Sequence, residues 1–387
     1  MRFQADELTN CMNVLIWNRR FLQAFGVWPL KIFDPIFVFS FIYTLLHCIL
    51  AFMDISNYNM DIDMIIANLS EVLLLFGVLV KITLCRLHKD SLSEFLIDIE
   101  TDFSTKNYRN RNEILSFIKY NKLSFLFLAI AIPCTGLATS TYYFRALALN
   151  IKMVAANSSF GYQLPYKTQP IVPIDDVLTY AFHCFYQILV PAFITFGYVG
   201  YDCFFITLSL HVSGQLSVLN HRVRDSLNEL HSHQHGMKTL IVSHKRLIRL
   251  ADTLENDFNI GTLQHLLITI WNICITGYNT LGSSNGQNVK LVIFLVFSIS
   301  VLSTLFVYCY VGERLTQESI KFGEAFYDSE WYNISPTDLK LVLICMVRSS
   351  KPLQLTSGKF FVLSLCTFTD IMKTSLGYLS VMRTFIN

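Results

Sequence analysis

Seven apolar stretches, each long enough to cross a lipid bilayer as a helix, alternate along this chain with polar segments. A transmembrane helix needs about 20 predominantly apolar residues. Charged residues make up 15% of the chain, whereas soluble domains carry about 25%. We therefore predict an all-α, polytopic membrane protein with seven transmembrane helices in a lipid bilayer. The stretches cover residues 32–53, 65–85, 123–143, 177–210, 260–278, 289–311 and 360–385.

Two of these stretches have additional features. The second contains two ionisable residues, Glu71 and Lys81. The fourth exceeds the thickness of a bilayer, so its helix is expected to tilt or to project beyond the membrane. Amphipathic helices are expected outside the membrane, because apolar residues recur at helical spacing in residues 212–230, 240–258 and 313–332.

The distribution of lysine and arginine predicts the orientation. The amino-terminal segment and the connections after the second, fourth and sixth stretches hold 22 of these residues, and the other connections hold three. Because positive residues are retained in the cytosol, we predict a cytosolic amino terminus and an extracellular carboxyl terminus. The triplet Asn157-Ser158-Ser159 falls in an extracellular connection and is a predicted glycosylation site, although such triplets also arise by chance.

Sequence motifs give no indication of catalysis. The patterns GxxxxGK[ST], GxGxxG and HExxH do not occur, and no Ser/His/Asp set is recognisable, so we expect neither an enzyme nor a cofactor. His231, His233 and His235 could form a metal tract, but we favour a solvated loop and predict no metal site. The ten cysteines do not suggest a disulfide framework. The net charge of +2 gives no support to a nucleic-acid partner, and we expect none.

The last stretch is apolar on most sides but carries a polar stripe. At 100° per residue, one face collects Thr367, Asp370, Thr374, Gly377, Tyr378, Val381 and Phe385. A polar stripe in a membrane helix faces protein or water, because exposure to lipid is costly. One interpretation is a helix held to its neighbours by hydrogen bonds. The other is a pore lining that ends in an apolar constriction at Val381 and Phe385.

The extracellular halves of the second to fourth stretches are rich in aromatic and small polar residues, which is typical of a pocket for a small apolar ligand. The alternative is an aromatic belt at the lipid headgroups, which Phe182 and Phe185 would also suit. The predicted ligand-binding residues are Thr139, Tyr142, Tyr143, Tyr186 and Val190.

A G-protein-coupled receptor is the obvious alternative for seven helices, but such a receptor has its amino terminus outside. It also usually carries Asp/Glu-Arg-Tyr after the third helix and Asn-Pro-x-x-Tyr in the seventh, and neither motif is present here.

The topology and four motifs together resemble the insect odorant receptors. The similar segments are GQLSVLNHRV, YCYVGERL, EAFYDSEWYN and the run from SSKPLQLTSGKFF to the end of the chain. The resemblance is strongest over residues 289–387. The related gustatory receptors, a second alternative, carry a Thr-Tyr-hydrophobic-Gln-Phe signature in the last helix, from which TSLGYLSVMRTF departs.

The resemblance implies an odorant-gated, non-selective cation channel in the plasma membrane, placed by family likeness in the dendrites of olfactory sensory neurons. A tuning receptor binds a small volatile odorant, and the odorant receptor co-receptor (Orco) completes a heterotetramer. This chain resembles a tuning receptor, because the co-receptor is longer and has a larger insertion between the fourth and fifth spans.

The resemblance also implies that the chain, residues 1–387, is a single channel subunit with two functional regions. Residues 1–210 would form mainly the ligand-binding bundle, and residues 211–387 mainly a cytosolic helical anchor domain and the pore helix. The family's gate falls on Val381 and Phe385, and Asp370 and Thr374 would line the pore on the cytosolic side of the gate.

Overall fold

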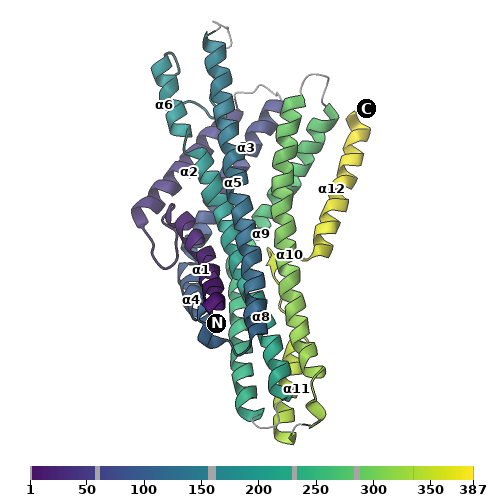
Figure 1. Cartoon of the computed structure of the whole chain (residues 1–387). Coiled ribbons are helices and arrows are strands. Elements are labelled where there is room, and N and C mark those ends of the chain that lie inside the picture. The colour runs from purple at the N-terminus through teal and green to yellow at the C-terminus, as the bar shows by residue number, and fades with distance from the viewer. Residues whose placement is uncertain are drawn as a thin grey trace.

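The computed structural model describes residues 2–56, 62–155, 163–228, 233–282, 288–333 and 335–386, and they are almost entirely helical (Figure 1). The all-α prediction is confirmed for these residues, apart from a hairpin of two short strands. The main helices are α1 (Arg2–Gln23), α2 (Asp34–Ile55), α3 (Ile62–Leu87), α4 (Lys89–Glu100), α5 (Arg111–Ala155), α6 (Val177–Gln187), α8 (Gly200–Asn228), α9 (His233–Gly282), α10 (Asn288–Tyr327), α11 (Pro336–Ser349) and α12 (Leu365–Ile386).

Three helices are much longer than a bilayer is thick. Helices α5, α9 and α10 contain 45, 50 and 40 residues, which corresponds to about 68, 75 and 60 Å at 1.5 Å per residue. The amphipathic segments predicted at 212–230, 240–258 and 313–332 are helical over most of their length and belong to the same long helices as the predicted spans. Within α9 and α10 the helix runs from span to amphipathic segment without a break, because no proline interrupts either helix, and α10 ends at Tyr327.

The fourth predicted span is interrupted, although the sequence there is continuously apolar. Helix α6 ends at Gln187 and is followed by the short helix α7 (Val190–Ala192), by a π-helix (Phe193–Val199) and then by α8. Pro191 lies at the interruption, where its missing N–H removes one backbone hydrogen bond. The prediction that this span projects beyond a bilayer is consistent with α8, which continues to Asn228.

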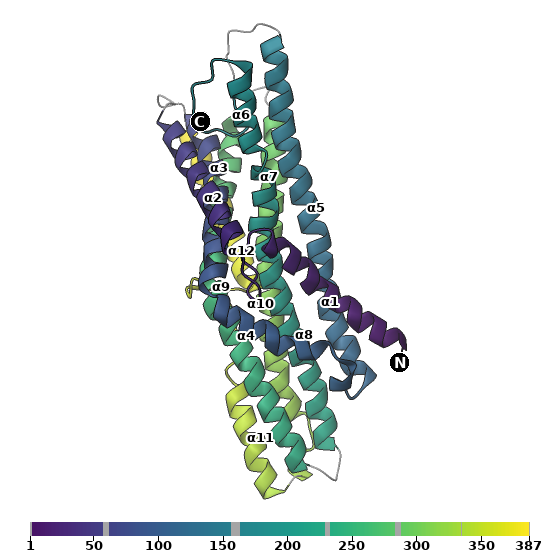
Figure 2. The ribbon, with the colours of Figure 1, turned by 90° about the vertical axis from the view of Figure 1, so that its left-hand side faces the viewer.

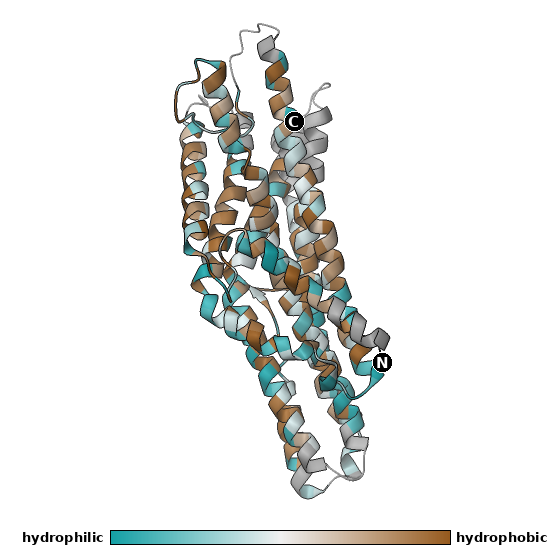
Figure 3. Ribbon diagram, turned by 60° about the vertical axis from the view of Figure 1, so that its left-hand side comes forward, coloured by the Kyte–Doolittle hydropathy of each residue, from teal (hydrophilic) through white to brown (hydrophobic). Residues whose placement is uncertain are grey.

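By length and composition, the part of the chain that the structure describes contains five candidate membrane helices. They correspond to the first five predicted spans and lie within Asp34–Ile55, Asn68–Leu87, Arg111–Lys152, Val177–Asp225 and Gly236–Ile275. Hydrophobic residues predominate in the half of the molecule that carries α2 and α6, and hydrophilic ones are more frequent towards the other end (Figure 3). The sixth predicted span falls in α10. The seventh was predicted to begin at residue 360, but Phe361 and Val362 form a strand, and the helix α12 begins at Leu365.

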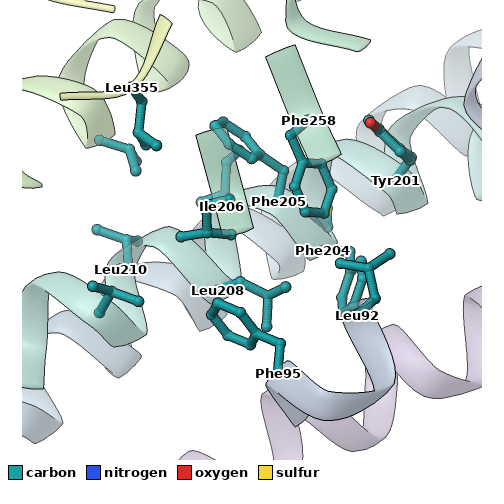
Figure 4. Packing of buried hydrophobic residues seen from close by; sticks show 14 of the residues in the cluster. Leu92, Phe95, Tyr201, Phe204, Phe205, Ile206, Leu208, Leu210, Phe258 and Leu355 are labelled. Atoms are coloured by element: carbon teal, nitrogen blue, oxygen red, sulfur yellow. The ribbon is translucent and has the colours of Figure 1, made fainter. Parts of the chain in front are cut away.

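Helix α8 forms the centre of the hydrophobic core. Tyr201 and Phe205 both pack against Phe258 of α9, with ring centroids 5.2 and 5.1 Å apart (Figure 4). On another side of α8, Leu92 and Phe95 of α4 join the same cluster (Figure 4). Helix α1 contacts α5 and α8 and crosses the side of the bundle (Figure 2).

A β-hairpin precedes α12 and fixes where that helix starts. Strands β1 (Thr356–Ser357) and β2 (Phe361–Val362) pair antiparallel around Gly358 and Lys359, which both have positive φ. Lys359 has a side chain, so its φ of 63° is strained. The Glu255 carboxylate of α9 accepts hydrogen bonds from both the N–H and the hydroxyl of Thr356. The hairpin therefore attaches the base of α12 to α9.

Candidate ligand-binding site and pore helix

Aromatic side chains from five segments gather at the end of the bundle that carries α6. We call them the aromatic cluster: Tyr43 and His47 of α2, Tyr142 and Tyr143 of α5, Tyr166 of the segment before α6, Tyr186 of α6 and Phe193 of the π-helix. Neighbouring ring centroids lie 4.7 to 6.3 Å apart. The cluster has apolar faces and several polar edges, as a site for a small molecule requires.

Three hydroxyl groups of the aromatic cluster connect the helices. Tyr43 Oη donates to the carbonyl oxygen of Tyr186 at 2.9 Å, and Tyr143 Oη donates to that of Cys184 at 2.7 Å. Tyr142 Oη donates to Oε1 of Glu71, on α3, at 2.5 Å. Because a buried polar group without a partner is costly, these bonds specify how α2, α3, α5 and α6 meet.

Two buried polar residues of α6 hold the preceding segment over the cluster. Gln187 accepts a hydrogen bond from the N–H of Tyr166 and donates one to its carbonyl oxygen, both at 2.9 Å. His183 Nε2 accepts from the N–H of Ile171 at 3.0 Å. On the other side, the N–H of Lys167 donates to Oε2 of Glu71 at 3.0 Å. These contacts place the Tyr166 ring inside the cluster.

The structure brings together three of the five residues predicted to bind a ligand. Tyr142, Tyr143 and Tyr186 belong to the aromatic cluster, whereas Thr139 lies beside the π-helix, 3.3 Å from the hydroxyl of Thr195. Val190 is completely buried at the start of α7. Phe182 and Phe185 are exposed, as the aromatic-belt interpretation requires.

The sequence analysis missed four members of the aromatic cluster, including Phe193 of the π-helix. Tyr43 and His47 are four residues apart within the first apolar stretch, a spacing that places both on one helix face and could have identified them. Tyr166 lies outside any helix, and no pattern around it indicates a buried position.

A second polar group lies deeper in the bundle, where charge is buried completely. Lys81 of α3 and Asp202 of α8 are 0% and 1% exposed, and their Nζ and Oδ1 atoms are 2.5 Å apart. Tyr308 Oη of α10 donates to the same Oδ1 atom at 2.5 Å, and His265 Nδ1 of α9 lies 4.0 Å from Oδ2. The Asp202 carboxylate thus connects α8 with α3, α9 and α10. Ionisable residues buried within a membrane protein are candidates for a functional role.

Helix α12 packs against α9 and α10 with one face and leaves its polar face exposed. Phe368 contacts Phe306 of α10 with ring centroids 5.4 Å apart. Asp370 and Thr374 are exposed, and a Cβ added at Gly377 would meet no atom within 4 Å. Val381 and Phe385 lie in the last turns of α12, and their side chains are outside the described part of the chain.

Two further predictions concern residues that the structure does not describe. Asn157 lies in residues 156–162, which are outside the described ranges. The side chains of His231, His233 and His235 are also outside them. Among the described side chains, no group of three or more His, Cys, Asp or Glu residues could hold a metal ion.

Comparison with known proteins identifies the kind of molecule. A family model described as "7tm Odorant receptor" matches residues 61–376. Odorant receptor 13a of Drosophila melanogaster is 27% identical over 59% of this chain and 58% of its own length. The odorant receptor coreceptor of Harpegnathos saltator is 27% identical over 38% of this chain and 30% of its own length. The matches span about half the length of the first curated relatives.

The fold is similar to that of a solved receptor. The structure of the olfactory receptor OR5 of Machilis hrabei in complex with eugenol superposes with a TM-score of 0.80. The superposition covers 98% of this chain and 100% of that one, at 12% identity.

The family model, together with the long apolar helices of the described chain, defines a multi-pass membrane receptor. The chain belongs to the insect odorant receptor family, because the family model covers most of its length. This membership confirms the resemblance to odorant receptors and decides against the gustatory and G-protein-coupled alternatives. The family consists of receptor channels, so the prediction that the chain is not an enzyme is confirmed as well.

Proposed function

We propose that this chain is the odorant-binding, tuning subunit of an odorant-gated, non-selective cation channel that it forms with the odorant receptor co-receptor. The subunit lies in the plasma membrane of olfactory neurons with its amino terminus in the cytosol, and Asn157 is a glycosylation site on the outer surface. The observation that carries the channel function is the exposed polar face of α12.

That face is unsuited to lipid. Asp370 and Thr374 are exposed in the single chain, on a helix whose opposite side packs against α9 and α10. An exposed carboxylate within a membrane span is costly in hydrocarbon, so this face is expected to border water or other subunits. A water-filled path between subunits satisfies this requirement, with Val381 and Phe385 forming an apolar constriction.

The aromatic cluster and its surroundings supply the ligand site. Thr139, Tyr142, Tyr143, Tyr186 and Val190 all lie on or beside the surfaces where α5, α6, α7 and the π-helix meet. Helix α12 packs against α9 and α10, and the Lys81–Asp202 pair connects these two helices to the π-helix: Lys81 lies over the Tyr198 ring, and Asp202 contacts His265 of α9 and Tyr308 of α10. Changes in packing at the ligand site can therefore reach α9 and α10 through one buried carboxylate.

The opposite end of the molecule has a surface suited to assembly. Leu343, Ile344 and Val347 of α11 are 53%, 62% and 69% exposed. In the proposed topology this helix lies in the cytosol, where an exposed apolar face indicates a protein partner. This is the expected position of the anchor domain that holds the four subunits together.

Opening would follow from a population shift. An odorant moves the equilibrium towards the open channel only if it binds the open arrangement more tightly than the closed one. Burial of a small apolar ligand contributes about 25 cal/mol per Å² of apolar surface, which permits micromolar sensing by shape alone. Polar contacts then add selectivity.

The test is to record current from cells that express this chain, with and without the co-receptor, across a panel of volatile odorants. We expect odorant-dependent cation current in co-expressing cells, and none from the co-receptor alone with the same odorants. A surface-expressed chain that gives no current with any odorant in the panel would contradict the tuning-subunit proposal.

A further inference from the structure

The hydroxyl groups of the aromatic cluster fall into two classes. Those of Tyr43, Tyr142 and Tyr143 donate to protein oxygen atoms and hold the helices together. Within the described part of the chain, Tyr166 Oη and Tyr186 Oη are buried and have no hydrogen-bond partner. The same is true of His47 Nδ1, from a third segment.

These three atoms belong to neighbouring side chains. The His47 ring centroid lies 5.8 Å from that of Tyr186 and 6.3 Å from that of Tyr166, so the imidazole neighbours both phenols. His47 is 1% exposed and Tyr166 is 3% exposed. Buried polar atoms are almost always paired, and three unpaired ones on adjacent rings indicate that another molecule satisfies them.

The chemistry of these atoms specifies the missing group. A phenol can donate a hydrogen bond, and an imidazole nitrogen that carries no proton accepts one. A hydroxyl group can accept from Tyr166 or Tyr186 and donate to His47 at the same time. An ether or an ester can only accept, and a hydrocarbon can do neither.

The carboxylate of Glu71, beside the aromatic cluster, does not favour a cationic ligand. Glu71 accepts one hydrogen bond at each oxygen, from Tyr142 Oη and from the N–H of Lys167. Because both Glu71 oxygens already have partners, the atoms that lack one are the two phenol oxygens and the imidazole nitrogen. These groups are neutral, so they suit the hydroxyl of a ligand better than an ammonium group. The flanking rings of Tyr43 and Phe193, 4.7 Å apart, offer apolar surface for the rest of the ligand.

From this arrangement we infer that the receptor is selective for a small alcohol or phenol whose hydroxyl group is bound by His47, Tyr166 and Tyr186. This inference rests on the proposed function and extends it to the chemical class of the odorant. The three residues act as specificity determinants, and the apolar body of the ligand supplies the remaining affinity.

The experiment compares ligands that differ only at the polar end. Benzyl alcohol, benzyl methyl ether and ethylbenzene form an aromatic series, and hexan-1-ol, methyl pentyl ether and heptane form an aliphatic one. Binding is measured as ligand-dependent thermal stabilisation of the full chain in lipid nanodiscs. In at least one series we expect the alcohol to bind about tenfold more tightly than the ether, as one or two hydrogen bonds would provide.

Variants of the same side chains identify the source of this preference. Tyr166→Phe, Tyr186→Phe and His47→Phe each remove an unpaired polar atom, so they should fold as the parent does and lower the alcohol-to-ether ratio severalfold. Tyr108→Phe, outside the aromatic cluster, is the matched control. It removes a buried hydroxyl that already donates to the carbonyl oxygen of Asp102, so it should lower thermal stability and leave the ratio unchanged.

Two outcomes overturn the inference: equal binding of alcohol and ether in both series, or no stabilisation by either alcohol. An unchanged ratio in all three variants assigns the preference to other residues and overturns it too. Current recordings keep the inference separate from the proposed function. Alcohol binding without any current in co-expressing cells counts against the channel, whereas current without alcohol preference counts against the hydroxyl site alone.

Discussion

At the scale of single residues, the buried Lys81–Asp202 pair is the most demanding feature of the structure. Removing two charges from water costs several kcal/mol for each, and attraction offsets this cost only where the remaining donors and acceptors are also satisfied. Here the hydroxyl of Tyr308 supplies a further hydrogen bond to Asp202, and the Lys81 ammonium lies 3.2 Å from the centre of the Tyr198 ring. The network therefore determines how α3, α8 and α10 meet.

Breaking this pair from one side should destabilise the receptor strongly. Lys81→Met leaves Asp202 buried without its cation, and Asp202→Asn leaves Lys81 without its anion. Each is expected to cost about 3–5 kcal/mol, and the double variant should recover much of that loss. Arg86→Met is the control, because its pair with Asp34 is partly exposed and worth about 0–1 kcal/mol. Thermal melting in detergent measures the stability of all four variants. A double variant as unstable as the two single losses added together would show that the charges do not interact.

Side-chain size at the predicted ligand-binding residues should determine which odorants act. Thr139→Leu fills space beside the π-helix, whereas Tyr186→Leu and Val190→Ala create it. We expect each change to reorder the odorant preference measured by current while surface expression is retained. Because truncation of a buried aromatic costs about 3–5 kcal/mol, only variants that reach the surface are informative. An unchanged ranking in every expressed variant would place the pocket elsewhere.

At the scale of secondary-structure elements, the hairpin fixes the position of the start of α12. The hairpin attaches the start of α12 to Glu255 of α9, and Gly312 of α10 allows a close approach, because a Cβ there would lie 2.3 Å from the carbonyl oxygen of Leu363. Helix α12 is thus held at its base, and its far end carries the residues assigned to the gate. The π-helix next to the ligand site is a second such element, and π-helical turns are frequent at functional sites.

Polar substitutions at the proposed gate should make the channel leak. An apolar ring stops ions because water leaves it, so Val381→Thr or Phe385→Ser should hydrate the constriction. We expect current without odorant, or altered cation permeability, in the complex with the co-receptor. Ile299→Thr makes a comparable change at an exposed position of α10 and should leave the resting current unaltered. Single-channel recordings that show parental resting open probability and selectivity in both gate variants would remove these residues from the gate.

At the scale of the whole molecule, orientation separates this receptor class from other seven-helix receptors. The excess of positive residues in alternate connections predicts that the two ends lie on opposite sides of the membrane. An epitope tag at Met1 should be labelled by antibody only after permeabilisation, and a tag after Asn387 should be labelled on intact cells. Labelling in the reverse pattern would contradict the proposed topology.

Assembly should depend on the exposed face of α11. Replacing Leu343 and Val347 together by serine removes apolar contact area without disturbing the core, since both side chains are more than half exposed. We expect less co-purification with the co-receptor and proportionally less current. Leu178→Ser, at an 82% exposed position of α6 at the other end of the bundle, is the control and should assemble normally. Full assembly of the double variant would exclude this face from the interface.

Local patterns predicted much of the architecture. Long apolar runs predicted membrane helices, since their length is set by the bilayer, and helical periodicity placed the polar side of α12 opposite its packed face. Tyr142, Tyr143 and Tyr186, which were predicted to bind a ligand, lie together in the aromatic cluster, because aromatic residues at the ends of adjacent spans tend to meet. Such patterns specify which face of a helix is buried or polar, and they do so within one segment of the chain.

The pairings between segments were decided only by the tertiary structure. Nothing near Lys81 indicates that its partner is Asp202, 121 residues later, or that Tyr308 would join them. Tyr166 enters the aromatic cluster because Gln187 and His183 bind its segment, and these bonds exist only once α6 has packed against α2 and α5. The sequence by itself thus determined the class, the helices and their polar faces, whereas the buried polar contacts depended on which helices became neighbours.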